Sequence, residues 1–233
     1  MTSVTTCYMC DSVETSREHA PPLCFFPEAK EFGRDLRRNL ITVPSCDQHN
    51  SKKSKDDEFL RSVVLMAAGS NQAGQHQFHW KILPATSRKP HTYRSFFADK
   101  GTVARGTGHA SQIDRDRFDL CIDHLARALF FHTFKRRWQL PVTTLSPNFY
   151  SGIDSDTMVP HQPTIEAVEV SRQVLGSEPV NGKNPDVFQY RIRYDEIEEG
   201  LAFAAIFYDC FEVYSYSSKD LANAALNTTE EPD

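Results

Sequence analysis

The sequence predicts an α+β protein: an N-terminal module of two extended segments and a helix, then a central amphipathic helix, then a C-terminal antiparallel β-sheet. Three observations lead to this prediction. Four of the six cysteines lie in the first 46 residues. Apolar side chains recur at helical spacing between residues 114 and 137, and apolar and polar residues alternate in several segments after residue 164.

The first part, residues 1–68, combines the cysteines with a strand and a helix. Residues 39–43 are β-branched and apolar and are followed by Pro44, which predicts a short strand. Ser45 is suited to cap a helix that begins near residue 46 and runs to about residue 68, where apolar residues recur with a helical period.

The second part, residues 69–140, is predicted to be a basic loop followed by a long helix. Residues 69–112 show no confident periodicity. Basic residues from Arg88 to Arg105 alternate there with aromatic ones, a pattern that fits either a nucleic-acid surface or a loop packed on the core. The helix over residues 114–137 ends in three cations, where the helix dipole favours positive charge.

The third part, residues 141–233, is predicted to be an acidic antiparallel region packed with the long helix. Alternation predicts strands at residues 164–174, 187–194, 201–208 and 211–216. Asn181-Gly182 predicts a hairpin turn. The meander resembles no family, and its acidity argues against contact with nucleic acid. It would repel DNA and restrict where substrate enters, bind a protein partner, or, in the simplest interpretation, serve as a folded scaffold.

Charge is distributed unevenly along the chain. The formal net charge is -5, but residues 88–137 carry 11 Lys and Arg against 5 Asp and Glu, whereas residues 138–233 carry 5 against 16. Only the middle of the chain is therefore suited to a polyanion. No apolar run approaches the ~20 residues of a membrane helix, and no secretory signal is visible at the N-terminus, so the expected compartment is the cytoplasm, without membrane contact.

Paired spacing of the N-terminal cysteines indicates a metal site. Cys7-x-x-Cys10 is followed by Cys46-x-x-His49. Thiols stay reduced in the cytoplasm, and two close pairs of Cys or His from separate elements are typical of a tetrahedral structural Zn²⁺ site. We therefore expect these four residues to bind zinc.

Short motifs between and after these pairs resemble the HNH endonuclease family, which has a ββα-metal fold often stabilised by a zinc knuckle. The resemblance covers about residues 7–60, and each motif is weak alone, but their order and spacing are fairly specific. The matching residues are Glu18 and His19 with Pro21 and Pro22, then Asn39 with Leu40, then Cys46, His49, Asn50 and Lys53.

This resemblance implies metal-dependent hydrolysis of DNA phosphodiester bonds. His19 would be the general base, and Glu18 and Asn50 would hold a catalytic Mg²⁺ or Mn²⁺. Asn39 would orient His19, so that the implied catalytic residues are His19, Asn39 and Asn50. Lys53 would face either phosphate or the side chain of Asn39. The chemistry is reasonable, because imidazole is a base near neutral pH and hard oxygen ligands suit these cations.

Two departures from the family pattern leave alternatives open. The second pair is CxxH where many members have CxxC, so His49 is either a zinc ligand, which we favour, or the family's last metal-binding histidine displaced by one position. The acid before His19 is glutamate where aspartate is commoner.

The expected partner is double-stranded DNA, contacted by Lys53 and by Arg136 and Arg137 at the end of the long helix. Those two arginines would serve equally to cap the helix dipole. Two alternatives to a DNA endonuclease remain: a zinc-stabilised nucleic-acid or protein-binding module without catalysis, and an RNA-directed nuclease.

Overall fold

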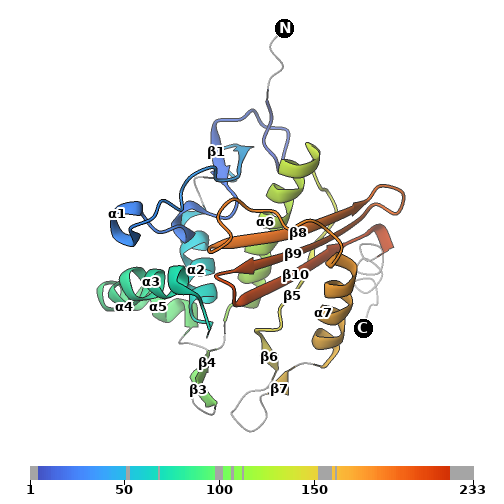
Figure 1. The fold of residues 1–233 in the computed structure, drawn as a ribbon. Coiled ribbons are helices and arrows are strands. Elements are labelled where there is room, and N and C mark those ends of the chain that lie inside the picture. The colour runs from blue at the N-terminus through green and yellow to red at the C-terminus, as the bar shows by residue number, and fades with distance from the viewer. Residues whose placement is uncertain are drawn as a thin grey trace, which may run out of the picture.

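The computed structural model describes residues 5–50, 53–67, 69–97, 102–105, 108–111, 113–151, 159–160 and 162–220. It combines helices with antiparallel sheets, as the sequence predicts (Figure 1). Within these ranges no helix is both long enough and apolar enough to cross a membrane.

The N-terminal part has the chain order strand, strand, helix. Strands β1 (Ser16–His19) and β2 (Thr42–Ser45) pair antiparallel, with Ser16 opposite Ser45 and His19 opposite Thr42. The loop between them contains the 3-10 turn η1 (Leu23–Phe25) and α1 (Ala29–Phe32). Helix α2 (Ser54–Leu65) follows.

The predicted start of this helix, near residue 46, is wrong. Residues 47–50 form turns, and the backbone N–H groups of His49 and Asn50 both donate to the carbonyl of Cys46, at 3.0 Å. This local turn returns the chain toward Cys46, so the regular helix begins only at Ser54.

Residues 72–97, which we call the helical arm, are helical although the sequence shows no clear period there. The arm consists of α3 (Gln72–Gln77), the π-helical turn η2 (Phe78–Ile82), α4 (Leu83–Arg88) and α5 (Pro90–Phe97). A π turn adds a residue to the helical repeat and so disrupts the 3.6-residue pattern by which helices are recognised in a sequence. Strands β3 (Thr102–Arg105) and β4 (Gly108–Ser111) pair antiparallel beyond it.

The predicted central helix is present as α6 (Arg115–Phe134). The Asp114 side chain caps its first turn by accepting from the N–H of Arg117, at 3.1 Å. The helix ends before the expected residue 137, because Lys135 adopts a left-handed conformation with φ of 58°.

The C-terminal sheet has the order β5-β10-β9-β8, with all neighbours antiparallel. Its strands are β5 (Thr143–Leu145), β8 (Phe188–Asp195), β9 (Gly200–Phe207) and β10 (Phe211–Ser217). The three longer strands confirm the predicted meander. A separate short pair joins β6 (Tyr150–Ser151) to β7 (Val159–Pro160).

The strand predicted at residues 164–174 is instead part of helix α7 (Gln162–Leu175). Val168 and Leu175 are buried, whereas Val170 and Val174 are exposed. Burial therefore follows a helical spacing of seven residues, and the exposed valines produced the misleading alternation.

Asn181-Gly182 does not connect two strands of the sheet, as was predicted, but lies between α7 and β8. Asn181 forms an isolated antiparallel bridge with Tyr190. Gly182 has a φ of 120°, and a Cβ at this position would lie 2.6 Å from the carbonyl oxygen of Phe188. Glycine is thus required by a close backbone approach rather than by a hairpin.

Helices α6 and α7 lie on opposite faces of the sheet. Phe118 of α6 contacts Phe211, with ring centroids 6.0 Å apart, whereas Arg172 of α7 donates to the hydroxyl of Tyr214. Residues 211 and 214 point to opposite faces because side chains alternate along a strand. Figure 1 shows α6 passing behind β8, β9 and β10.

One hydrophobic core cluster extends from Cys7 to Val213 and includes residues of all three predicted parts. The N-terminal module is therefore held against α6 and the sheet by shared apolar contacts. The division at residues 68 and 140 stays a prediction.

Candidate metal centre and adjoining histidine pocket

The two ligand pairs predicted from the sequence converge on one point. The ligand atoms of Cys7, Cys10, Cys46 and His49 all lie within 4.8 Å of one another. The Nδ1 atom of His49 lies 3.5, 3.6 and 3.3 Å from the sulfurs of Cys7, Cys10 and Cys46, and the sulfurs of Cys10 and Cys46 are 3.8 Å apart.

These separations match the edges of a tetrahedral zinc site. Bonds of ~2.3 Å to sulfur and ~2.05 Å to nitrogen require edges of about 3.8 Å between sulfurs and about 3.6 Å between sulfur and nitrogen. The cluster can therefore hold a metal such as Zn²⁺ with little movement of its side chains. The geometry also selects Nδ1 of His49 as the ligand atom.

Backbone hydrogen bonds fix the position of the first pair. The N–H of Cys7 donates to the carbonyl of Ser12 at 2.9 Å, and the N–H of Tyr8 donates to Pro44 in β2 at 2.8 Å. The knuckle that carries Cys7 and Cys10 is thus attached directly to the strand that leads to Cys46. Cys7 and Cys46 are buried, whereas Cys10 and His49 are half-buried.

His19 stands at the end of β1 and faces a narrow pocket of about 10 Å³, the room that one water molecule needs. One part of the pocket is lined by the polar side chains of Glu18, His19, Lys53 and Asp57. Another part is lined by residues of α6, namely Cys121, Leu125 and Ala128.

The pKa of His19 is lowered below its usual 6.5, first by burial and then by the positive charge of Arg37, with Glu18 opposing. The imidazole has no hydrogen-bond partner among the described residues. His19 is thus a neutral, half-buried base beside a water-sized space, which is the state that proton abstraction requires.

Glu18 is already paired. Its Oε1 accepts from the ammonium group of Lys53, and the two side chains are only 9% and 11% exposed. Its Oε2 accepts a long hydrogen bond of 3.5 Å from the Ser45 hydroxyl. The predicted divalent-cation ligand and the predicted phosphate contact therefore neutralise each other inside the protein.

Asn50 also has a local role. Its Nδ2 donates to the Ser16 hydroxyl at 2.8 Å and to the carbonyl of Arg17 at 3.5 Å, which fastens β1 to the turn after Cys46. The amide nitrogen of Asn50 is used in this way, and Glu18 is bound to Lys53 and so does not present a free carboxylate to a cation. The assignment of Glu18 and Asn50 as ligands of Mg²⁺ or Mn²⁺ therefore stays a prediction.

The other predicted site residues lie apart from the pocket. Asn39 is exposed in the turn before β2, with a φ of 54°, and its side chain makes no hydrogen bond to a described residue. Arg136 pairs with Glu196 at 2.7 Å, and Arg137 pairs with Asp11 at 2.5 Å.

Two residues of the site were missed from the sequence. Asp57, in the first turn of α2, lines the pocket, and burial raises its pKa to about 6. His124 of α6 approaches His49, with ring centroids 6.4 Å apart. The helical period of α6 indicated its buried face, but no sequence pattern shows that this face meets the metal cluster.

Comparison with known proteins identifies no family for this chain. No protein-family model matches the sequence, and neither the curated proteins nor the solved structures compared with it give a match.

Proposed function

We propose that residues 7–60 form an HNH-type nuclease module that hydrolyses phosphodiester bonds of DNA. The observation that carries the proposal is the position of His19, a neutral half-buried imidazole at the end of a strand that is tied to the Cys7/Cys10/Cys46/His49 cluster. The chain order of two antiparallel strands and a helix agrees with the ββα arrangement of that family.

In the proposed reaction His19 accepts a proton from water. The resulting hydroxide attacks phosphorus, and the bond to the 3′ oxygen breaks, which leaves a 5′-phosphate and a 3′-hydroxyl once that oxygen is protonated. Asn50 contributes by holding β1, and therefore the backbone of His19, against the turn after Cys46. Zinc bound to the four ligands would supply a rigid anchor for both segments.

Dependence on Mg²⁺ or Mn²⁺ remains a proposal that rests on the family resemblance. Because Lys53 pairs with Glu18, no step of the reaction is assigned to a divalent cation. The test is incubation of the purified protein with supercoiled plasmid, linear duplex, single strands and RNA, with and without each cation.

The critical variant is His19→Ala, which should abolish cleavage while keeping the zinc content of the parent. His132→Ala is a matched control, because His132 is another half-buried histidine of lowered pKa but lies in the last turn of α6. Equal cleavage by His19→Ala and the parent would show that His19 is not the base.

One observation favours a second function, a zinc-stabilised binding module without catalysis. The buried Lys53–Glu18 pair leaves no free carboxylate at the position where the resemblance implies a cation ligand. This function predicts binding of nucleic acid or protein, with no cleavage of any substrate at any cation concentration. Cleavage of RNA alone in the same assay would instead support the RNA-directed alternative.

A further inference from the structure

The helical arm belongs to a stretch of the chain without negative charge. Residues 59–98 contain none of the 31 Asp and Glu residues, although they contain five Lys and Arg and three His. In a protein of net charge -5, these 40 residues carry an excess of positive charge, although Lys81 and Lys89 lie beside Glu31 and Glu58.

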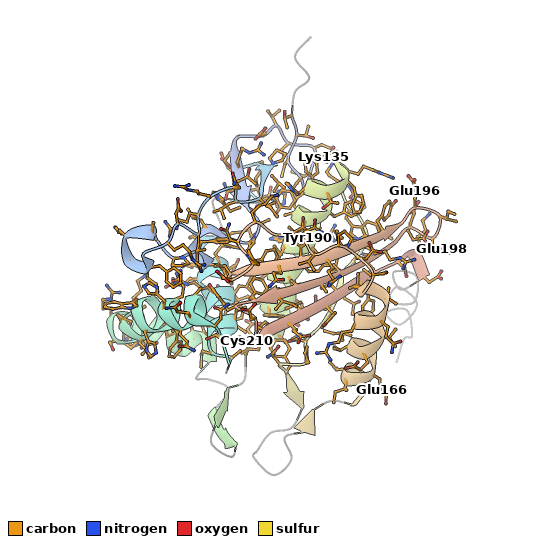
Figure 2. All side chains as sticks on the ribbon, in the orientation of Figure 1. Lys135, Glu166, Tyr190, Glu196, Glu198 and Cys210 are labelled. Carbon is orange, nitrogen blue, oxygen red and sulfur yellow. The ribbon has the colours of Figure 1, made fainter. Side chains whose placement is uncertain are left out.

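The acidic part of the surface lies elsewhere. Glu196 and Glu198 mark the tip of the β8–β9 hairpin, and Figure 2 shows them at the end of the sheet away from α3, α4 and α5. A polyanion that approaches the arm therefore does not meet this acidic hairpin.

The arm also exposes an aromatic ring. Trp80, in the π-helical turn, is 66% exposed, and Leu83 beside it is 44% exposed. The His76 ring lies near the indole, with centroids 6.2 Å apart, and is itself held by Phe32 and the carbonyl of Glu31. The indole is thus supported from the protein side and open to solvent.

Two of the aromatic residues that the sequence suggested as stacking groups, Tyr93 and Phe96, are not available. Tyr93 and Phe96 are 5% and 3% exposed and pack in the core. Of the two tryptophans, Trp138 is buried and donates to Ser217. Stacking on this face can therefore use Trp80 but not those three rings.

The cations of the helical arm are only partly neutralised. Lys81 pairs with Glu31 at 2.8 Å, but among the described residues Arg88 donates only to the carbonyl of Pro84 in its own helix. The Lys89 ammonium is 4.0 Å from Glu58, and its side chain is 62% exposed. Arg88 and Lys89 are therefore positioned to contact phosphate groups without breaking a close ion pair.

We propose that the helical arm binds single-stranded nucleic acid, with Trp80 stacked on an unpaired base and with Arg88 and Lys89 at phosphates. Base faces are open to an indole only in unpaired strands, which selects a single strand over a duplex. As a statement that the nuclease module receives a single strand, the proposal rests on the proposed function. Binding of the strand to the arm does not require cleavage.

The arm is attached to the proposed nuclease module. Lys81 and His76 both contact Glu31 of α1, and Gln77 donates to the carbonyl of Phe25 at 3.2 Å. These contacts join the arm to the loop between β1 and β2, the loop that begins directly after His19.

The test measures binding of a fluorescent oligothymidine of about twenty nucleotides, and of its duplex with oligoadenine, to the full chain carrying His19→Ala, so that no cleavage intervenes. Trp80→Ala should weaken single-strand binding about tenfold, within the range expected for one stacked base, and Trp80→Phe should retain most of the affinity. Ile197→Ala is the matched control, because Ile197 is 91% exposed at the acidic hairpin.

Two further readouts separate stacking from charge. The single strand should quench the emission of Trp80, because the other tryptophan is buried. Replacing both Arg88 and Lys89 by Ala should reduce the salt slope of binding by about 1.4, which is ~0.7 for each phosphate that a cation no longer neutralises.

The proposal is overturned if Trp80→Ala binds the strand as tightly as its parent, or if duplex binds as well as single strand and loses as much affinity in Trp80→Ala. Binding of the arm to vesicles of phosphatidylcholine and phosphatidylserine, with none to oligonucleotide, would also overturn it and identify a lipid surface instead. These outcomes are distinguishable from failure of the proposed function. If the parent protein binds the strand but never cleaves it, the binding surface is supported and only the nuclease function is refuted.

Discussion

The buried pair of Lys53 and Glu18 allows a quantitative test of how the candidate site is held together. Lys53→Met removes the ammonium group and leaves the carboxylate of Glu18 unpaired in a position where it is 9% exposed. Removing one partner of a buried ion pair costs ~3–5 kcal/mol, because the remaining charge is desolvated without compensation.

This destabilisation should be large in a melting experiment. For a chain of this size, each kcal/mol lowers Tm by roughly 2–4 °C, so Lys53→Met should melt about 6–20 °C below the parent. Thermal unfolding would be followed by circular dichroism with zinc in excess, so that metal loss does not contribute. The double variant Lys53→Met/Glu18→Gln should recover most of the stability, since neither partner then carries a charge.

Arg136→Met serves as the control, because Arg136 and Glu196 form an exposed pair, with side chains 55% and 76% exposed. Such pairs contribute ~0–1 kcal/mol, so this control should change Tm by no more than about 4 °C. If Lys53→Met loses no more stability than Arg136→Met, the buried pair does not stabilise the site.

Three other predictions concern the metal and the ionisable groups of the pocket. Metal analysis should find one zinc ion per chain in the parent and none in Cys46→Ser. Cys210→Ser should keep the zinc ion, because Cys210 lies outside the cluster. A full zinc complement in Cys46→Ser would contradict the ligand assignment. The rate of cleavage should rise with pH with a midpoint below pH 6.5, because burial and Arg37 lower the pKa of His19 and only the neutral imidazole accepts a proton; a midpoint above pH 6.5 would exclude this environment for the base. Burial raises the pKa of Asp57 from 3.8 to about 6, so its contribution to stability is complete below pH 3.8 and is lost as pH rises through 6. Denaturant titrations should therefore show that Asp57→Asn raises stability at pH 7 relative to the parent, and an equal stability of the two proteins at pH 7 would refute the shift.

The N-terminal cluster shows how far local sequence information reaches. The spacing of Cys7, Cys10, Cys46 and His49 was enough to predict a four-ligand site, because each pair lies on one turn and ligand chemistry demands convergence. The period of α6 and the alternation of β8, β9 and β10 were similarly readable, since each element buries one face along its whole length.

Tertiary contacts decided the features that the sequence did not determine. The exposed valines of α7 imitate a strand, and only packing against β9 shows which residues are buried. The state of the candidate site also depends on distant residues: Lys53 lies 35 positions from Glu18 in sequence, and their pairing determines whether that carboxylate is available to a cation.

Residue types and their spacing within single turns were sufficient to predict the Cys7/Cys10/Cys46/His49 cluster and to single out the histidine at the end of β1. The surroundings of those groups became visible only in the folded chain: Glu18 is bound by Lys53, Asn50 fastens β1, Asp57 is buried beside His19, and Trp80 is exposed on the helical arm. The physical reason is that burial and pairing are set by elements brought together from distant parts of the chain, and both pKa and ligand availability follow from burial and pairing.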